Sequence, residues 1–429
     1  MKRIKVIIAG CGSRGSDAYG RIMQGMPEQY EVVGVAEPID ARRNNMKERF
    51  SLSDDVCFLD WKDMAAQPKF ADLVVIATQD YMHRDPALAF IEKGYDVLLE
   101  KPMAPTPKEC MEIVQAAKKH NTKILVCHVL RYTKFFKTLK KIINDGMIGD
   151  LQVINHCEDV GHIHQSHSFV RGNWRNSKET TPMILAKCCH DTDLLQWLVG
   201  NPCKKVQSFG SLSHFNAKNA PEGAPDRCTD GCPHADTCFY NAVKIYYDDK
   251  NNAWFRNVCG QKPNPTDDEI MEQLKTGPYG RCVYKCDNDV VDHQTLNMEF
   301  ENGETVTLTM TAFTKGGRHT RIMGTKGEIE AHAKDDFITV FTFADKQYHQ
   351  IKIDNYVGGN TIASGHGGGD SGIMTALYEY VTDTYEGFSI CDIETSARNH
   401  LISFAAEESR VNGGTVVDLD EYAKRFFEA

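Results

Sequence analysis

The chain has 429 residues, of which 41% are apolar and 25% are charged, so it can bury a large core and divide into about two domains. Its 59 acidic and 49 basic residues give a formal net charge of -10 without a long block of either sign, which argues against a nucleic-acid partner. No apolar run approaches the length of a membrane span, so no membrane partner is expected, and 15 cysteines without a secretory signal favour reduced thiols in a cytoplasmic protein.

Short runs rich in Val, Ile and Leu alternate with helical stretches through the first third of the chain. The runs have the composition of strands that are buried on both faces. They occupy residues 4–9, 30–36, 73–77, 97–99 and 124–127. Helices are expected at 86–93 and 107–120, each with a proline at its start. This order predicts an α/β fold with a parallel, doubly wound sheet.

The first strand leads into a glycine-rich turn, Gly10-Cys11-Gly12-Ser13-Arg14-Gly15, at the start of a predicted helix. Glycines also serve ordinary turns, but here the strand, the turn and the helix occur together. Gly10 would allow the tight turn, Gly12 would let the backbone approach a pyrophosphate, and Gly15 would permit close helix packing. The first amides of the helix, at Ser13 and Arg14, would face the anion. The turn therefore predicts a dinucleotide site.

Glu37 ends the second strand, in the segment VVGVAE. A carboxylate at this place accepts hydrogen bonds from an adenosine ribose and repels a 2'-phosphate. Glu37 therefore favours NAD as the cofactor. Arg42 and Arg43 follow closely and keep NADP as the alternative.

Two polar segments follow the next two buried strands. Thr78 and His83 lie in ATQDYMH, and Glu100 and Lys101 lie in VLLEKPMA. Because the carboxyl ends of parallel strands meet at one edge of the sheet, where ligands bind, we expect all four to contact the cofactor. A surface ion pair is the plainer explanation for Glu100 and Lys101, but such a pair seldom stands between a buried strand and a proline.

Six segments spread along the chain resemble the Gfo/Idh/MocA family of sugar and polyol oxidoreductases. They are AGCGSRG, ATQDYMH, VLLEKPMA, HVLRYTKFFKTLKKIINDGMIGDL, CCHDTDLLQWLVG and AAEESRVNGGTVVDL. The most specific are the EKP element and the later HDxDLLxWLxG pattern. The resemblance implies an NAD-dependent enzyme that acts on CH–OH groups.

The resemblance also implies two domains, a Rossmann domain at residues 1–127 and a substrate-binding α/β domain at 128–429. The second domain would contain an open, largely antiparallel sheet, a Cys-rich insertion around 215–290 and a C-terminal helical segment. Alternating or β-rich runs support this sheet independently, at 151–156, 295–300, 305–311 and 338–343.

Hydride transfer from a carbinol requires a group that takes the hydroxyl proton. Lys101 is the candidate that the EKP element provides. A free lysine has a pKa near ~10.4, so a lysine base needs burial or nearby positive charge to act at neutral pH. Lys187 could supply that charge, and it stands about one turn before His190 if the segment is helical. His190 would share the hydrogen bond to the reacting hydroxyl, although a core histidine is the plainer reading.

Ala186 departs from the family pattern. Many members have an aspartate four residues before the histidine that corresponds to His190, whereas this chain has Ala186 in TTPMILAKCC. Lys187 either takes over the role of the aspartate or is a solvated lysine. The departure fits a subgroup that acts on glycosides or other elaborated sugars.

Further polar side chains are assigned from their places in the chain. Trp174-Arg175 resembles the family's Trp-Arg pair near the nicotinamide, so both are expected at the cofactor. The candidates for substrate binding are Arg131, Tyr132, His164, His167, His366 and Asp370. The last two lie in SGHGGGDSG, which could equally be a flexible connector.

Five cysteines gather in the expected insertion: Cys228, Cys232 and Cys238 in DRCTDGCPHADTC, and Cys282 and Cys286 in RCVYKC. Four thiolates would suit a structural zinc ion. The spacings differ from paired CxxC motifs, so free thiols are the favoured interpretation. The histidines of GHIHQSH are more typical of a polar pocket than of a metal site. No metal is expected for hydride transfer.

Three functions from different classes are compatible with these features. The favoured one is an NAD-dependent dehydrogenase of a sugar, sugar derivative or cyclitol. The second is a glycosidase of the same fold that oxidises, eliminates and re-reduces its substrate with NAD. The third is a cofactor-binding regulator, which Lys101 and His190 disfavour. The resemblance further implies a homo-oligomer.

Overall fold

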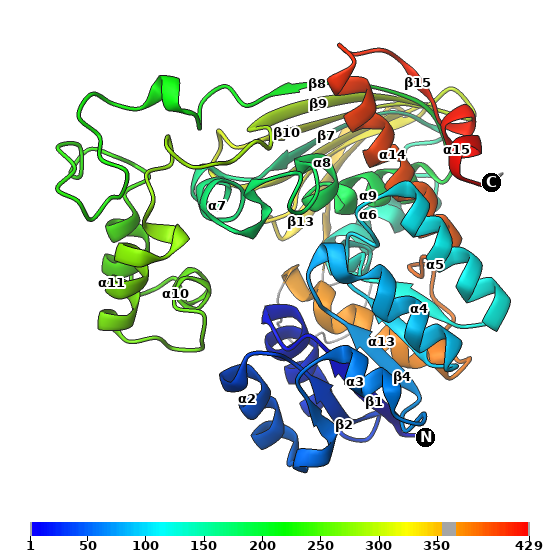
Figure 1. Ribbon diagram of the computed structural model, residues 1–429. Coiled ribbons are helices and arrows are strands. Elements are labelled where there is room, and N and C mark those ends of the chain that lie inside the picture. Colours follow the sequence, from blue (N-terminus) through cyan, green and yellow to red (C-terminus); the bar gives the residue numbers. More distant parts are fainter. Residues whose placement is uncertain (1, 354–365, 428–429) are drawn as a thin grey trace.

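The computed structural model describes residues 2–353 and 366–427. Two β-sheets dominate it, one at each end of the molecule, with helices packed between them (Figure 1). The N-terminal sheet has six strands and the second sheet has nine. This arrangement confirms the expected fold class of a doubly wound sheet followed by an α/β domain.

The N-terminal sheet has the strand order β3-β2-β1-β4-β5-β6, and all its pairs are parallel. Its strands are β1 (Ile4–Ala9), β2 (Tyr30–Ala36), β3 (Cys57–Phe58), β4 (Leu73–Ile76), β5 (Asp96–Leu99) and β6 (Ile124–Val126). Every residue of β4 is buried, as expected for a strand covered on both faces. The order reverses between β1 and β4, and a cofactor binds outside the carboxyl ends at such a point.

Helices connect and cover these strands. They are η1 (Ser13–Gly20), α1 (Arg21–Gln24), α2 (Asp40–Phe50), α3 (Trp61–Ala66), α4 (Arg84–Glu92) and α5 (Pro107–His120). Thr106 caps α5, since its side chain accepts a hydrogen bond from the amide of Glu109. The glycine-rich turn is followed by a π-helical stretch, η1, rather than by a regular α-helix.

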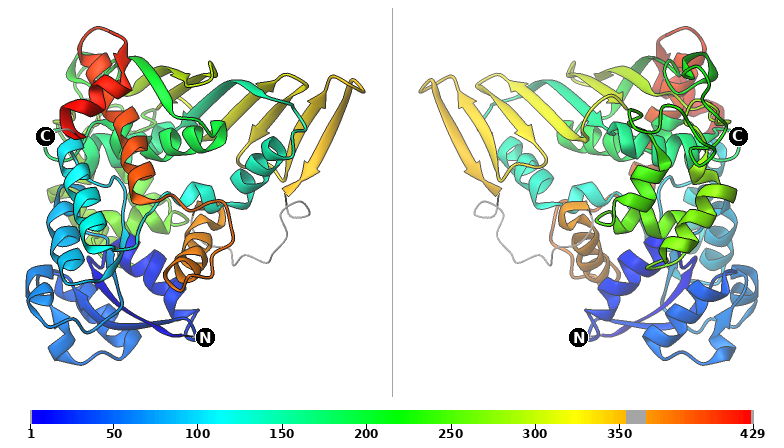
Figure 2. Two further views of the ribbon diagram at one scale, coloured as in Figure 1. Left: turned by 90° about the vertical axis from the view of Figure 1, so that its right-hand side faces the viewer. Right: turned by 90° about the vertical axis from the view of Figure 1, so that its left-hand side faces the viewer.

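The second sheet is mixed and mostly antiparallel, with the order β14-β13-β12-β11-β7-β10-β9-β8-β15. Only β7 and β10 pair in parallel among its described strands. The strands are β7 (Leu151–Asp159), β8 (Cys203–Ser211), β9 (His293–Phe300), β10 (Thr305–Thr311), β11 (Gly317–Gly324), β12 (Gly327–His332), β13 (Phe337–Thr342), β14 (Gln347–Lys352) and β15 (Val417–Asp418). Buried and exposed residues alternate along β9, so one face is packed and the other is open. The β12–β14 end projects beyond the helices (Figure 2).

A layer of helices fills the space between the two sheets (Figure 1). It contains α6 (Lys134–Asn144), α8 (Met183–Ala186) and α9 (Cys189–Val199). The long helix α14 (Ile393–Val411) contacts β8, α9 and α5, and α15 (Leu419–Phe427) ends the described chain. No helix among the described residues is long and apolar enough to cross a membrane.

The helices of the C-terminal segment pack against both sheets: α14 contacts the second sheet, and α13 (Gly369–Val381) contacts the N-terminal sheet. Helix α13 returns to the N-terminal sheet, where Ile373 and Leu377 join the apolar core of β1. The hydroxyl of Tyr30 also donates to the carbonyl of Met374 at 2.6 Å. The N-terminal sheet is therefore completed by a helix from the far end of the chain.

The insertion leaves the second sheet after β8 and returns at β9. It forms a lobe at the left of Figure 1 with its own small apolar core. Its helical parts are η7 (Ala217–Asn219), η8 (Val243–Asp248), α10 (Ala253–Cys259), α11 (Asp267–Thr276) and η9 (Pro278–Gly280). Three short segments precede it: α7 (His162–His164), η5 (Gln165–Arg171) and η6 (Asn173–Arg175).

Candidate active site

The glycine-rich turn has the shape that a pyrophosphate requires. Gly10 has a φ of +90°, and a Cβ atom there would lie 2.5 Å from the carbonyl oxygen of Ala77. A Cβ atom at Gly15 would lie 2.0 Å from the carbonyl oxygen of Gly10. At Gly12 the nearest atom, Nη1 of Arg42, would be 3.9 Å away. The outer glycines are thus demanded by packing, whereas Gly12 leaves space for a ligand.

The first turn of η1 offers donors to that space. Gly12 is its N-cap and no side chain caps it, while Ser13 is exposed. Uncapped amides at a helix N-terminus attract an anion. The residues present therefore fit the diphosphate of a dinucleotide.

Glu37 is fixed beside this turn. Its carboxylate accepts backbone amides from Cys11 at 2.7 Å and Ile39 at 3.1 Å, and the side chain is buried. Arg43 donates to the carbonyl of Glu37 at 2.7 Å and also pairs with Asp40. Arg43 is consequently engaged by the protein itself.

Arg14 joins three parts of the chain. It donates to Glu100 at 2.6 Å, to Tyr19 at 2.6 Å and to Asp370 in the first turn of α13 at 2.8 Å. Burial acts to raise the pKa of Glu100, but Arg14, Tyr19 and Lys101 together outweigh it and hold that pKa below its usual value. Arg14, which is partly exposed, thus joins the buried carboxylates of Glu100 and Asp370 in an ion network that ties α13 to the nucleotide-binding edge.

Lys101 lies where the two domains meet. Its ammonium donates to the backbone carbonyl of Ala186 at 2.9 Å and lies 6.0 Å from the ring centroid of Trp174. The indole of Trp174 donates to Asp80, just after β4, at 2.8 Å. These contacts connect the ends of β4 and β5 to the helix layer of the second domain.

His83 holds the Lys101 loop in place. Its ring is fully buried and contacts the carbonyl oxygens of Pro102 at 2.7 Å and Thr78 at 3.2 Å. Both contacts are to protein backbone, so His83 positions the segments after β4 and β5.

The junction of α8 and α9 carries the other two catalytic candidates. Lys187 follows the last residue of α8, and His190 is buried in the first turn of α9. The two residues do not share one helix, because α8 ends at Ala186 and a new helix begins at Cys189. Lys187 pairs with Glu158 at 3.3 Å. Since Lys101 contacts Ala186, all three candidates lie around this junction.

His164 belongs to the same neighbourhood. Burial lowers the pKa of His164 well below its usual value, and the nearby charges of Lys187 and Lys101 act in the same direction. A neutral imidazole beside two lysines can accept or donate one hydrogen bond to a hydroxyl-rich ligand.

A buried charged network lies beside Lys187 and was not predicted from the sequence. Arg318 in β11 pairs with Glu158 at 2.5 Å and donates to Asp191 at 2.7 Å, and His156 contacts Asp191 at 3.0 Å. Burial acts to raise the pKa of Asp191, but Arg318 and His156 outweigh it and hold that pKa well below its usual value. Asp191 stands directly after His190 in CCHDTDLLQW, and this adjacency was the available signal.

Two residues that were predicted to bind the substrate, Arg131 and His167, have partners inside the protein instead. Arg131 is buried and donates to both carboxylate oxygens of Asp193 at 2.7 Å. His167 bonds the hydroxyl of Tyr246 at 2.9 Å and stacks on Phe255 in the lobe. The structure therefore gives Arg131 and His167 partners within the protein core.

The structure also places four other residues that were predicted to contact the substrate or the cofactor. Tyr132 is buried next to Arg131, and Arg175 pairs with Asp287 at 2.9 Å at the base of the lobe. Asp370 is engaged by Arg14. His366 begins the turn η10 (His366–Gly368), but its side chain lies outside the described residues.

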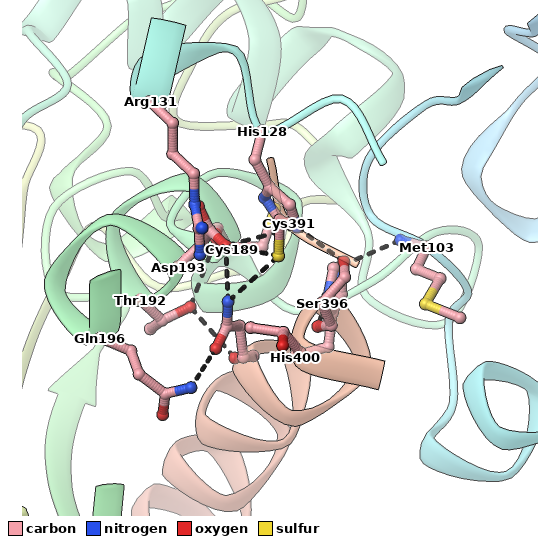
Figure 3. A network of polar contacts seen from close by, with 12 residues as sticks. Met103, His128, Arg131, Cys189, Thr192, Asp193, Gln196, Cys391, Ser396 and His400 are labelled. Carbon is pink, nitrogen blue, oxygen red and sulfur yellow. Dashed lines mark hydrogen bonds and ion pairs between the residues drawn. The ribbon is translucent and has the colours of Figure 1, made fainter. Parts of the chain in front are cut away.

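A polar network around Asp193 is built into the core between α9 and α14 (Figure 3). Among the described residues, His128, Asp193 and Cys391 form the one trio of potential metal ligands whose donor atoms lie within 4.8 Å of one another. Asp193 is already neutralised by Arg131 and accepts a hydrogen bond from Asn399 at 2.5 Å. Burial raises the pKa of Cys391 well above its usual value, which disfavours a thiolate. This network therefore has the features of a hydrogen-bonded core.

The site combines a glycine-rich turn that can hold a dinucleotide with a lysine at the boundary to a second, sheet-based domain. This combination is typical of NAD-binding oxidoreductases. The chain belongs to the Gfo/Idh/MocA oxidoreductase family: residues 4–128 match its NAD-binding Rossmann fold and residues 140–417 match its C-terminal α/β domain. Membership in this family confirms three predictions from the sequence: the family itself, an enzyme of the oxidoreductase class, and NAD as the cofactor.

Individual relatives are distant. An oxidoreductase of Bacillus subtilis, YteT, is 23% identical over 87% of this chain and 88% of its own length. The 2,7-anhydro-N-acetylneuraminate hydratase of Mediterraneibacter gnavus is 26% identical over 50% of this chain and 54% of its own. The inositol 2-dehydrogenase of Burkholderia multivorans is 28% identical over 48% and 57%, respectively. These last two alignments cover little more than half of each relative.

Solved structures share the complete fold. Levoglucosan dehydrogenase in complex with NADH and L-sorbose superposes with a TM-score of 0.71 at 19% identity, covering 98% of this chain and 99% of that one. An oxidoreductase domain protein from Kribbella flavida has the same TM-score at 16% identity, covering 98% and 100%.

Proposed function

We propose that the protein is an NAD-dependent oxidoreductase that removes a hydride from a hydroxyl-bearing carbon of a sugar, a sugar derivative or a cyclitol. The observation that carries this proposal is the 2.9 Å hydrogen bond between Lys101 and Ala186. It brings the end of β5, at the cofactor edge, against the helix junction that carries Lys187 and His190. Inositol and levoglucosan dehydrogenases among the similar proteins support this substrate class.

Lys101 is the proposed acid–base group. When bound, NAD+ supplies the acceptor for the hydride that leaves the carbinol carbon. The Nζ atom of Lys101 takes the proton of the substrate hydroxyl, and His190 shares the hydrogen bond to the same oxygen. Lys187 and His164 line the substrate side of Lys101, where they orient further hydroxyl groups.

The proposed cofactor contacts follow from the same geometry. Glu37 accepts the adenosine ribose hydroxyls, which favours NAD over NADP. Trp174 shields the space next to Lys101 from water. The other proposed contacts are Gly10, Gly12, Ser13, Gly15 and Thr78.

The proposal is tested by incubating the protein with NAD+ and a panel of sugars, cyclitols and aryl glycosides. Absorbance of NADH is followed together with release of the aglycone. NADH that accumulates in proportion to oxidised product supports the dehydrogenase.

Glycoside cleavage by transient oxidation is the second candidate, and Ala186 is the observation that favours it. The missing carboxylate leaves a lysine pair, Lys101 and Lys187, together with Glu158 beside the reacting carbon. A ketone formed there would acidify the neighbouring C–H bond, which allows a base to promote elimination. The 2,7-anhydro-N-acetylneuraminate hydratases among the relatives give this route added weight. Repeated aglycone release without NADH accumulation would identify it.

The cellular setting is part of the same proposal. We expect the enzyme to act on small carbohydrates in the cytoplasm and to form a homo-oligomer through the open face of its second sheet.

A further inference from the structure

The lobe contains a long loop that has little regular structure to stabilise it. Residues 220–241 hold neither a helix of their own nor a strand, apart from one isolated bridge between Arg227 and Arg281. The apolar cluster beneath the loop has only five buried members, Val170, Phe215, Tyr240, Val283 and Ala312. Loops of this length inside a compact unit usually need a further constraint.

Four cysteines of the lobe surround one cavity. Cys228, Cys232 and Cys238 come from the long loop, and Cys282 comes from the segment after η9. The cavity measures about 20 Å³, which is close to the room that one water molecule needs. All four thiols are free and partly buried.

Two backbone hydrogen bonds hold these segments in register. The amide of Cys228 donates to the carbonyl of Gly280 at 2.9 Å, and the amide of Cys282 donates to the backbone carbonyl of Asp226 at 2.8 Å. Cys228 and Cys282 are therefore juxtaposed by the fold itself, although they stand 54 positions apart in the chain.

Arg171 lines the same cavity and lacks an anionic partner. Its guanidinium is completely buried and donates to the carbonyls of Arg281 and Tyr240, both at 2.7 Å, and to the sulfur of Cys228 at 3.8 Å. No carboxylate pairs with it among the described residues, and its Nη1 atom has no hydrogen-bond partner. A buried cation without a counter-charge is unfavourable. An anionic centre in the cavity would supply that charge.

Two of the sulfurs also receive backbone amides. The amide of Tyr240 is directed at the sulfur of Cys238, and the amide of Tyr284 is directed at the sulfur of Cys282. In each case the donor is two residues beyond the cysteine.

We propose that Cys228, Cys232, Cys238 and Cys282 bind a metal centre as four thiolates, taking either a zinc ion or an iron–sulfur cluster. Each thiol releases its proton on binding, and four thiolates around Zn²⁺ leave a net charge of about -2 that Arg171 partly balances. The centre would fasten the long loop to the segment after η9. It is separate from Lys101 and takes no part in hydride transfer.

The separation of the sulfurs bears on which centre is bound. Zn–S bonds of ~2.3 Å place the sulfurs of a zinc tetrahedron ~3.8 Å apart. Within the described residues, no three of these sulfurs meet the 4.8 Å limit that His128, Asp193 and Cys391 meet. A zinc ion would therefore require the cysteine side chains to rotate inward. An iron–sulfur cluster would also require the cavity of about 20 Å³ to widen.

Cys286 provides a matched control. It lies four residues after Cys282 and is absent from the lining of the cavity. Its thiol lies 3.3 Å from the carbonyl oxygen of Cys282, to which it donates. Cys286→Ser should therefore keep the metal, while Cys228→Ser and Cys282→Ser should lose it.

The test measures zinc, iron and acid-labile sulfide in the full-length protein purified both in air and without oxygen. We expect one zinc per chain, or iron and sulfide in equal amounts with visible absorption. Either result, lost in Cys228→Ser and retained in Cys286→Ser, supports the proposal and identifies the occupant.

A second measurement applies if the variants do not fold. Thiol-reactive reagent is added to the folded wild-type protein before and after treatment with a strong chelator. Four additional thiols that react after chelation support the site. Protein that contains neither zinc nor iron in both preparations, with thiols that react equally before and after chelation, would overturn the proposal.

Discussion

The ammonium of Lys101 donates its hydrogen bond to the backbone carbonyl of Ala186, which stands where the family resemblance leads us to expect an aspartate. A carbonyl is neutral, so it orients the lysine without giving it a full counter-charge. The carboxylate of Glu158, near this junction, is engaged by Lys187 and Arg318 instead. Lys101 is thus positioned by backbone and by the face of Trp174, and its role in proton transfer can be tested by substitution.

Lys101→Met should leave the fold and the NAD affinity nearly unchanged but lower turnover by ~100-fold or more, because a positioned acid–base group typically contributes on that scale. Steady-state kinetics and calorimetric titration with NAD+ measure the two effects. Lys108→Met, on the exposed first turn of α5, serves as the control and should be neutral. Turnover that survives the loss of Lys101 would show that another group moves the proton.

Lys187→Met tests a positioning role at the substrate. Since Lys187 is held by Glu158, we expect it to contact ground-state hydroxyls, and its loss should raise KM by ~10-fold, equivalent to ~1.4 kcal/mol, with a smaller change in kcat. Lys205→Met removes a comparable but exposed ion pair with Glu299 and should change neither constant. An unchanged KM would show that Lys187 does not contact the substrate and has only a structural role.

Glu37→Ala addresses cofactor choice. The unmodified protein should bind NAD more tightly than NADP, and the substitution should narrow the gap because the carboxylate that repels a 2'-phosphate is gone. Calorimetric titration with both cofactors gives the ratio. Equal or tighter binding of NADP by the unmodified protein would refute the role given to Glu37.

Asp370→Ala separates a structural role from substrate binding. The side chain is buried and pairs with Arg14, so its removal leaves part of a buried charge uncompensated and should lower the free energy of unfolding by roughly 3 kcal/mol. KM should change little. Asp17→Ala removes the exposed partner of Arg21 and is the control for stability. A large rise in KM with an unchanged free energy of unfolding would show that Asp370 binds the substrate instead.

The stability of the protein should fall as the pH is lowered from about 6.5 towards 4. Burial lowers the pKa of His128 to about 3, of His167 to about 3 and of His400 to about 4. Below the ordinary histidine pKa, the unfolded chain therefore binds protons that the folded chain does not. Each histidine contributes a slope of roughly 1.4 kcal/mol per pH unit, and this contribution is complete above pH 6.5.

His167→Phe isolates one of these contributions. Phenylalanine keeps the stacking with Phe255 but cannot be protonated, so the pH slope of the unfolding free energy should decrease by roughly 1.4 kcal/mol per unit. Urea unfolding between pH 5 and pH 7 measures it. His120→Gln, at the exposed end of α5, should leave the slope unchanged. An unaltered slope in His167→Phe would mean that this ring titrates normally.

The parallel sheet could be predicted because its strands carry a strong local signal. A strand such as β4 is apolar at every position when both of its faces are buried, and the outer glycines of the turn, Gly10 and Gly15, are required by close backbone contacts. Strands β8 and β14 were not predicted, because CKKVQSFGS and QYHQIK carry polar residues along much of their length. The return of α13 to the N-terminal sheet has no local signal at all.

The candidate site was only partly predictable for a related reason. Lys101 lies in a specific short motif, whereas the contact between Arg318 and Asp191 joins residues 127 positions apart. Whether a polar side chain at the end of a strand contacts a ligand or the core depends on partners that are distant in the sequence. Arg131, for example, was expected to bind the substrate but binds Asp193 in the core. His164 and His167 were both expected to bind substrate, but His167 lies in the π-helical stretch η5 and bonds the hydroxyl of Tyr246 in the lobe.

The most direct test of the central claim follows one hydrogen atom. A sugar or cyclitol that the panel identifies is prepared with deuterium on the oxidised carbon and is incubated with NAD+ and the protein. Mass spectrometry then measures deuterium in the recovered NADH and in the product. The dehydrogenase predicts one deuterium in each NADH and a ketone product that contains none. Deuterium that remains in the carbohydrate product over many turnovers, without accumulation of labelled NADH, would contradict net oxidation.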